Sequence, residues 1–131
     1  MTDFSKIIHP ELSYKINGIL FSVHNDLGRF CNERQYGDAV ENGLKKLNIQ
    51  YEREKILPPA FESEFKGRNK IDFLIENKII LEIKTKRFLA REDYYQLKRY
   101  LVALNKKLGI LVNFHQRYIE PKRILNSSSK E

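Results

Sequence analysis

The chain has little of the chemistry on which many enzymes and secreted proteins depend. Its 131 residues include one cysteine, Cys31, three histidines and no tryptophan. A single cysteine cannot form an internal disulfide, which is typical of a protein from a reducing compartment. The sequence contains no cluster of histidines and cysteines that would indicate a zinc site. It also contains no Gly-rich segment ending in GK[ST], the mark of a phosphate-binding loop, and Cys31 has no evident base partner. These absences argue against zinc, nucleotide-loop and cysteine chemistry.

Long apolar runs are also missing. No run approaches the roughly 20 residues of a membrane span. The first residues, MTDFSKIIHPEL, lack the charged, apolar and small-residue regions of a signal peptide. We therefore predict a cytoplasmic protein with no membrane partner. The length predicts one domain, residues 1–125, and the polar segment 126–131 predicts a disordered tail.

Positive charge is what the chain has in excess. The net charge is +7 and the sequence pI is about 9.5, which suits a nucleic-acid partner but does not by itself demonstrate one. Basic residues gather in the second half, among tyrosines that could stack on bases. The alternative is a solvated helix with a basic outer face. The basic residues are Lys84, Lys86, Arg87, Arg91, Lys98, Arg99, Lys106 and Lys107.

Apolar spacing predicts three helices and several strands. The helices are expected at 10–27, ended by Gly28, at 33–47, and at 91–106. Strands are expected at 51–57, 61–66, on both sides of 76–78, at 109–114, and at the sheet edge within 117–125. The predicted helical core stripes are Leu12, Ile16, Ile19, Leu20, Val23 and Leu27, then Tyr36, Val40, Leu44 and Leu47, then Tyr94, Leu97, Leu101 and Leu104. The strand, helix and strand from 79 to 114 predict a parallel pair in an α/β fold.

The segment Lys70–Lys86, KIDFLIENKIILEIKTK, carries charges inside two apolar runs. A three-residue connection at 76–78 pairs Phe73 with Leu81 and sets Asp72 opposite Glu82. In this register Ile71, Phe73 and Ile75 share one face of the first strand. On the second strand Ile79, Leu81 and Ile83 lie opposite Ile80, Glu82 and Lys84.

Two facing carboxylates are unfavourable without a counter-ion. Mg²⁺, with Mn²⁺ as a substitute, suits such a site because it takes one or two carboxylates together with waters and phosphates. We therefore predict that Asp72 and Glu82 ligate the ion, with the Ile83 carbonyl as a further ligand. Lys84, on the face of Glu82, could orient a water or neutralise phosphate charge.

Three other polar residues have two interpretations each. Glu33, in the first turn of the second helix, is interpreted first as a carboxylate that favours the helix dipole, and the alternative is a site carboxylate. Gln96 and Tyr100 lie one turn apart, so they could reach one spot or simply border the apolar stripe.

The ordered set Asp72, Glu82-Ile83-Lys84, and Gln96 with Tyr100 resembles the PD-(D/E)xK nuclease superfamily and its QxxxY helix. Leu27-Gly28, Glu33 with Tyr36, and the strand 109–114 narrow the resemblance to the small GxxExxY proteins. Phe30 stands where that name expects glycine, and Ile71 precedes Asp72 in place of proline. The resemblance covers roughly residues 10–125.

That resemblance implies a restriction-endonuclease-like fold, a central mixed β-sheet flanked by helices. It also makes Glu33 a further carboxylate of the site, able to support the metal, and gives Gln96 and Tyr100 a positioning role. We predict a Mg²⁺-dependent nuclease acting on DNA in preference to RNA. The alternatives are a catalytically inactive nucleic-acid-binding module and a protein-interaction module, such as a homodimer through the first helix.

Overall fold

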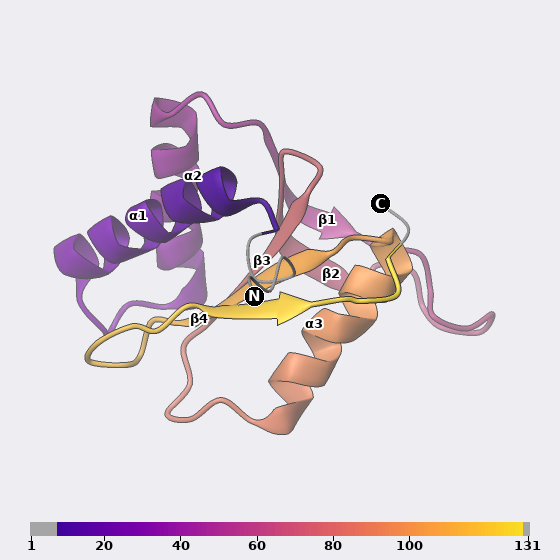
Figure 1. The fold of residues 1–131 in the computed structure, drawn as a ribbon. Coiled ribbons are helices and arrows are strands. Elements are labelled where there is room, and N and C mark those ends of the chain that lie inside the picture. The colour runs from indigo at the N-terminus through magenta and orange to yellow at the C-terminus, as the bar shows by residue number, and fades with distance from the viewer. Residues whose placement is uncertain (1–7, 130–131) are drawn as a thin grey trace, which may run out of the picture.

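A five-stranded mixed sheet lies between two layers of helices (Figure 1). The computed structural model describes residues 8–129. The strands are β1 (Tyr51–Ile56), β2 (Lys70–Ile75), β3 (Ile79–Lys84), β4 (Leu108–Asn113) and β5 (Lys122–Leu125), in that order across the sheet. Strands β3 and β4 are parallel, and the other neighbours are antiparallel. The predicted α/β class with a central mixed sheet is confirmed.

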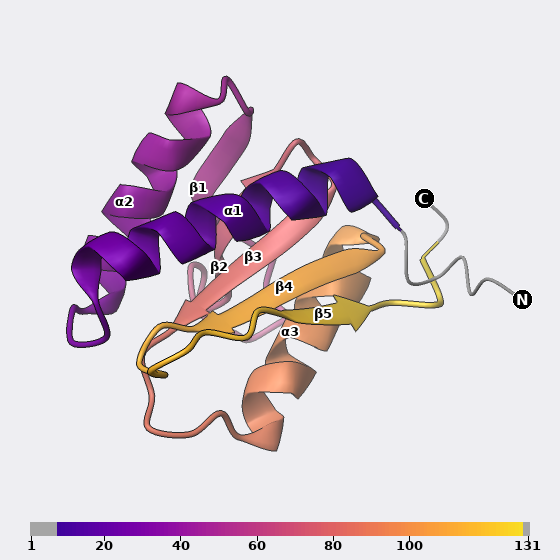
Figure 2. The ribbon, with the colours of Figure 1, turned by 60° about the vertical axis from the view of Figure 1, so that its left-hand side comes forward.

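Helices α1 (Pro10–Leu27) and α2 (Glu33–Lys46) cover one face, and α3 (Arg91–Leu104) covers the other (Figure 2). Helix α1 ends at Gly28, whose φ of 74° favours glycine. Helix α2 begins with a capping box, in which Asn32 and Gln35 each accept a hydrogen bond from the other's backbone amide. None of the helices within residues 8–129 is both long enough and apolar enough to cross a bilayer.

The helical stripes are largely buried as predicted, but their last members are not. Leu27 and Leu47 are 39% and 51% exposed, respectively. Leu27 is the last residue of α1, and Leu47 is the C-cap residue of α2, so both lie where a helix gives way to a loop.

The β2–β3 hairpin has the predicted register. Phe73 pairs with Leu81, and Ile75 pairs with Ile79. Glu76 and Asn77 both have positive φ, and the amide of Lys78 donates to the carbonyl of Ile75. This tight turn lies within the predicted three-residue connection 76–78, on either side of which Ile75 and Ile79 pair.

Side-chain alternation holds along β3 and fails at the start of β2. In β3, Ile79, Leu81 and Ile83 pack under α1 and α2. Ile71, however, packs with the α3 cluster, whereas Phe73 and Ile75 pack on the opposite side, so the prediction that all three share a face is wrong. The break lies beside Glu54 of β1, whose φ of 53° interrupts the regular strand.

The strand predicted at 61–66 is also wrong, because this segment forms turns and bends. Its polar groups bond locally, since the Glu64 carboxylate accepts from the Ala60 amide at 2.7 Å and from the Asn69 side chain at 2.6 Å. Such side-chain bonds compete with strand pairing.

The C-terminal part of the sheet follows the sequence more closely. The edge strand begins after Pro121, at Lys122. Of the predicted tail, Asn126 to Ser129 form a turn, and residues 130–131 lie outside the described residues.

Close packing of α3 on β4 gives a stability prediction. A Cβ added at Gly109 would lie 2.9 Å from three carbons of the fully buried Leu97. Gly109→Ala should therefore lower the free energy of unfolding by about 1–3 kcal/mol in urea titrations. Gly18→Ala is the control, because Gly18 lies in α1 with nothing within 4 Å of its added Cβ. That change should raise stability by about 0.5–1 kcal/mol, and equal effects would contradict the packing argument.

Candidate active site

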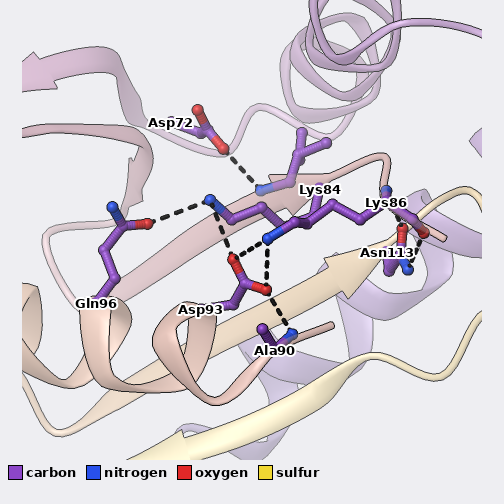
Figure 3. A network of polar contacts seen from close by, with 8 residues as sticks. Asp72, Lys84, Lys86, Ala90, Asp93, Gln96 and Asn113 are labelled. Atoms are coloured by element: carbon purple, nitrogen blue, oxygen red, sulfur yellow. Dashed lines mark hydrogen bonds and ion pairs between the residues drawn. The ribbon is translucent and has the colours of Figure 1, made fainter. Parts of the chain in front are cut away.

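The polar site begins where the backbone pairing between β2 and β3 ends. Their pairing runs from Ile75–Ile79 to Phe73–Leu81. At the next position the Asp72 carboxylate takes over, accepting a hydrogen bond from the Ile83 amide at 2.7 Å (Figure 3). A side chain thus replaces a backbone partner, which holds the carboxylate of Asp72 against the end of β3.

Glu82 is the most constrained acid of the site. It is 4% exposed, and its Oε1 is buried without a hydrogen-bond partner among the described residues. Burial raises the pKa of Glu82 well above its usual range, the Asp72 carboxylate raises it further, and Lys84 acts in the opposite direction. Asp72 and Glu82 therefore lie close enough for their charges to interact, as the hairpin register predicts.

Glu33 reaches the same region from the start of α2. Burial and then the Asp72 charge raise the pKa of Glu33, while Lys84 and the Thr85 amide lower it. Glu33, Asp72 and Ile83 together line a pocket of about 230 Å³. A larger, mainly apolar groove of about 810 Å³, which borders α1 and α2, contains none of these groups.

Tyr36 explains how α2 is held in place to present Glu33. Its ring stacks on Phe114 at 4.2 Å between centroids, with an interplanar angle of 8°. Its hydroxyl donates to the Gly28 carbonyl at 2.5 Å and accepts from the Cys31 amide at 3.2 Å. Tyr36 therefore ties the α1–α2 loop and the first turn of α2 to the end of β4.

Lys84 lies across the sheet face toward α3. Its Nζ donates to Gln96 Oε1 at 3.2 Å and lies 3.9 Å from Asp93 Oδ1 (Figure 3). Tyr100, one turn beyond Gln96, is buried, and burial followed by the Glu82 charge raises its pKa. Gln96 thus contacts Lys84, and Tyr100 lies near enough to Glu82 to feel its charge, which agrees with one of the two interpretations that their spacing leaves open.

Asp93 and Asn113 are not among the residues predicted for the site, and Lys86 is predicted only as one of the basic residues. Asp93 binds Lys86 Nζ through both oxygens at 2.9 and 3.0 Å and accepts from the Ala90 amide at 2.8 Å. Asn113 accepts from the Lys86 amide at 3.0 Å and donates to the Lys86 carbonyl at 2.7 Å. One signal was available, since Asn113 is polar at the carboxyl end of a buried parallel strand, where sites in open α/β sheets form.

Comparison with known families agrees with this arrangement. The model of a family described as the PD-(D/E)XK nuclease superfamily matches residues 10–124. The chain belongs to this superfamily. Neither the curated proteins nor the solved structures contain a match. The predicted superfamily is confirmed, and the narrower assignment to the GxxExxY proteins stays a prediction.

Nucleases of this superfamily typically use a divalent metal, and the residues here fit one. Asp72 and Glu82 offer hard oxygen donors, and the unpartnered Glu82 Oε1 lacks the bond that a cation would supply. No group of three or more His, Cys, Asp or Glu within residues 8–129 is placed to hold an ion. Mg²⁺ does not need one, because it is usually bound by one or two carboxylates with waters and substrate oxygens.

Asp93 should stabilise the fold in a pH-dependent way. Burial raises its pKa, but the Ala90 amide and the two lysines outweigh burial, so the net pKa is below its ordinary value. Asp93→Asn should lower the free energy of unfolding by about 1–3 kcal/mol at pH 7. Because the folded pKa lies below the unfolded one, the contribution of the Asp93 charge is fully present above about pH 4 and is lost as pH falls from there through the folded pKa, so the difference should shrink below about pH 4.

The control for Asp93→Asn is Glu120→Gln, which removes an exposed ion pair with Lys122. It should change stability by no more than about 1 kcal/mol. Denaturant titrations between pH 3 and pH 8 measure both variants. An Asp93→Asn deficit that stays constant down to pH 3 would show that charge does not hold this network.

Whereas the charge of Asp93 should stabilise the fold, the charge of Glu82 should destabilise the metal-free protein. Because its folded pKa is raised, the ionised form costs stability as pH rises from about 4.3, the unfolded value, through the folded value. In the absence of divalent ions, Glu82→Gln should raise the free energy of unfolding at pH 8 by on the order of 1 kcal/mol. The two proteins should converge near pH 4, and a less stable variant at pH 8 would contradict this account.

Proposed function

We propose that this protein is a divalent-metal-dependent nuclease that hydrolyses phosphodiester bonds, in DNA in preference to RNA, with Mg²⁺ or Mn²⁺. The observation that carries the proposal is the buried Glu82 carboxylate, with one unpartnered oxygen, between Asp72 and Lys84. Superfamily membership supports nuclease chemistry. The restriction-endonuclease-like sheet is the reason for preferring DNA, and the net charge of +7 suits either nucleic acid.

The protein's own groups would divide the work as follows. Asp72, Glu82 and the Ile83 carbonyl would hold the ion, which when bound lowers the pKa of a water and stabilises charge on the phosphate. Lys84, held by Gln96 and Asp93, would bind a phosphate oxygen or orient the attacking water. Glu33 would support the ion or accept a hydrogen bond from one of its waters. Gln96 accepts a hydrogen bond from the Lys84 ammonium, and Tyr100, which is buried near enough for the Glu82 charge to raise its pKa, would help position the site.

Cleavage assays test this proposal with single- and double-stranded DNA and RNA in Mg²⁺, Mn²⁺ or EDTA. Wild-type protein should cleave only with metal. Asp72→Ala should lower the rate by about 100-fold or more because it removes a carboxylate that would hold the ion, and Lys84→Ala should do the same because it removes positive charge that would stabilise the reacting phosphate. Lys15→Ala removes an exposed lysine of α1 and should leave the rate unchanged.

Activity that survives Asp72→Ala would reject the assignment. Salt-sensitive binding without metal-dependent turnover would favour the inactive nucleic-acid-binding module instead. A protein that binds no nucleic acid at low salt and forms a stable dimer in light scattering would favour the interaction module. We keep a homodimer through α1 as a prediction to be measured in the same samples.

A further inference from the structure

Three exposed aromatic rings stand out because they share a second feature. Phe30, Phe88 and Tyr118 are 82%, 76% and 75% exposed. Each follows an arginine in the sequence, and that arginine lies over its ring. The distances from guanidinium carbon to ring centroid are 5.2, 5.7 and 5.4 Å for Arg29, Arg87 and Arg117, respectively. Single exposed apolar residues need no explanation, but a repeated arginine–aromatic unit does.

The three units lie in the three loops at one end of the sheet. These are the α1–α2 loop (28–32), the β3–α3 loop (85–90) and the β4–β5 loop (114–121), which gather at the carboxyl ends of β3 and β4 in both views (Figures 1 and 2). Arg29 Nε donates to the His115 carbonyl at 2.9 Å, and the Phe30 ring meets the His115 ring at 5.9 Å. Asn113 joins the end of β4 to Lys86, so the loops form one connected surface.

This surface adjoins the carboxylates. Lys84 ends β3, and its carbonyl accepts from the Phe114 amide at 2.9 Å. The β3–α3 loop, which carries Phe88, starts at the next residue. A strand bound along the loops would therefore lie close to the site formed by Asp72, Glu82 and Lys84.

Among residues 8–129, no carboxylate forms an ion pair with Arg29, Arg87 or Arg117. Within the described part of the chain, each unit thus offers a flat apolar ring beside a positive charge that no carboxylate pairs with. An unpaired nucleotide has the complementary pair of features, a base with a π-face and a phosphate.

We propose that Phe30, Phe88 and Tyr118 form a stacking platform for unpaired nucleobases, with their arginines contacting the phosphates. The ligand class is a single-stranded segment of nucleic acid. This inference rests on the proposed function for its substrate class. Bases paired in a duplex are stacked on one another and cannot lie on these rings, so the platform selects single strands over duplexes.

Binding measured without divalent ions separates the platform from catalysis. Fluorescence anisotropy would compare the full chain with a single-stranded DNA, the same sequence as RNA, the duplex, and an abasic strand of equal length. Phe88→Ala and Tyr118→Ala should each weaken binding of single strands by roughly 5- to 150-fold. Neither should change binding of the abasic strand, and Phe88→Trp should retain wild-type affinity.

Tyr14→Ala is the matched control. Tyr14 is 81% exposed but lies on α1, about 20 Å along the helix from Gly28. Its loss should leave affinity unchanged. Salt titrations give a second readout, since Arg87→Gln should reduce the slope of log affinity against log salt by about 0.7, whereas Phe88→Ala should not change it. Thermal melts verify that each variant folds.

Equal affinity for the normal and abasic strands, or ring variants that bind like wild type, would overturn the platform. The nuclease proposal would stand if such a protein still cleaved DNA through Asp72. Conversely, ring-dependent binding of single strands by a protein that never cleaves would support the platform and reject the nuclease. Preference for DNA or RNA would identify the source of the unpaired bases.

Discussion

The site depends on one hydrogen bond, from the Ile83 amide to the Asp72 carboxylate. Without it the end of β3 would need another backbone partner, and β2 would be the nearest. Because the side chain satisfies the amide, the two strands can separate beyond Phe73 and Leu81 while the sheet stays paired behind them. The separation brings Asp72 near Glu82 and Glu33, so a buried, a half-buried and an exposed acid come close enough for their charges to interact.

Basic side chains around the acids reduce the repulsion between them, and packing contacts hold the surrounding elements in place. On the α3 side, Lys84 and Lys86 converge on Asp93, which keeps both ammonium groups close to the sheet. On the α2 side, Tyr36 clamps the helix start to Phe114. Glu82 remains incompletely satisfied, and an unsatisfied buried acid costs folding free energy. Such local instability is expected where binding or catalysis, and not folding, selects the residue.

Local rules predicted much of this fold. Helix starts at Pro10, Glu33 and Arg91, the hairpin register and the parallel β3–β4 pair all followed from periodicity, turn residues and connection length. The wrong predictions lie at positions where contacts with residues distant in the sequence determine the local structure. Residues 61–66 have the composition of a strand, yet Glu64 bonds the local backbone instead. Strict alternation would place Ile71 on the same face of β2 as Phe73 and Ile75. Beside the distorted backbone of β1 at Glu54, it packs on the opposite face, under α3.

By itself the sequence determined the superfamily, the order of elements and the pairing that places Asp72 near Glu82, because these depend on residue type and short-range spacing. Only the tertiary structure decided which polar groups support them. Asp93 lies in the first turn of a helix and Asn113 lies in an apolar run, and neither position by itself indicates a partner. Their partners, Lys84, Lys86 and the β3–α3 loop, come from segments 7 to 27 residues away, and only folding brings those segments into hydrogen-bonding distance.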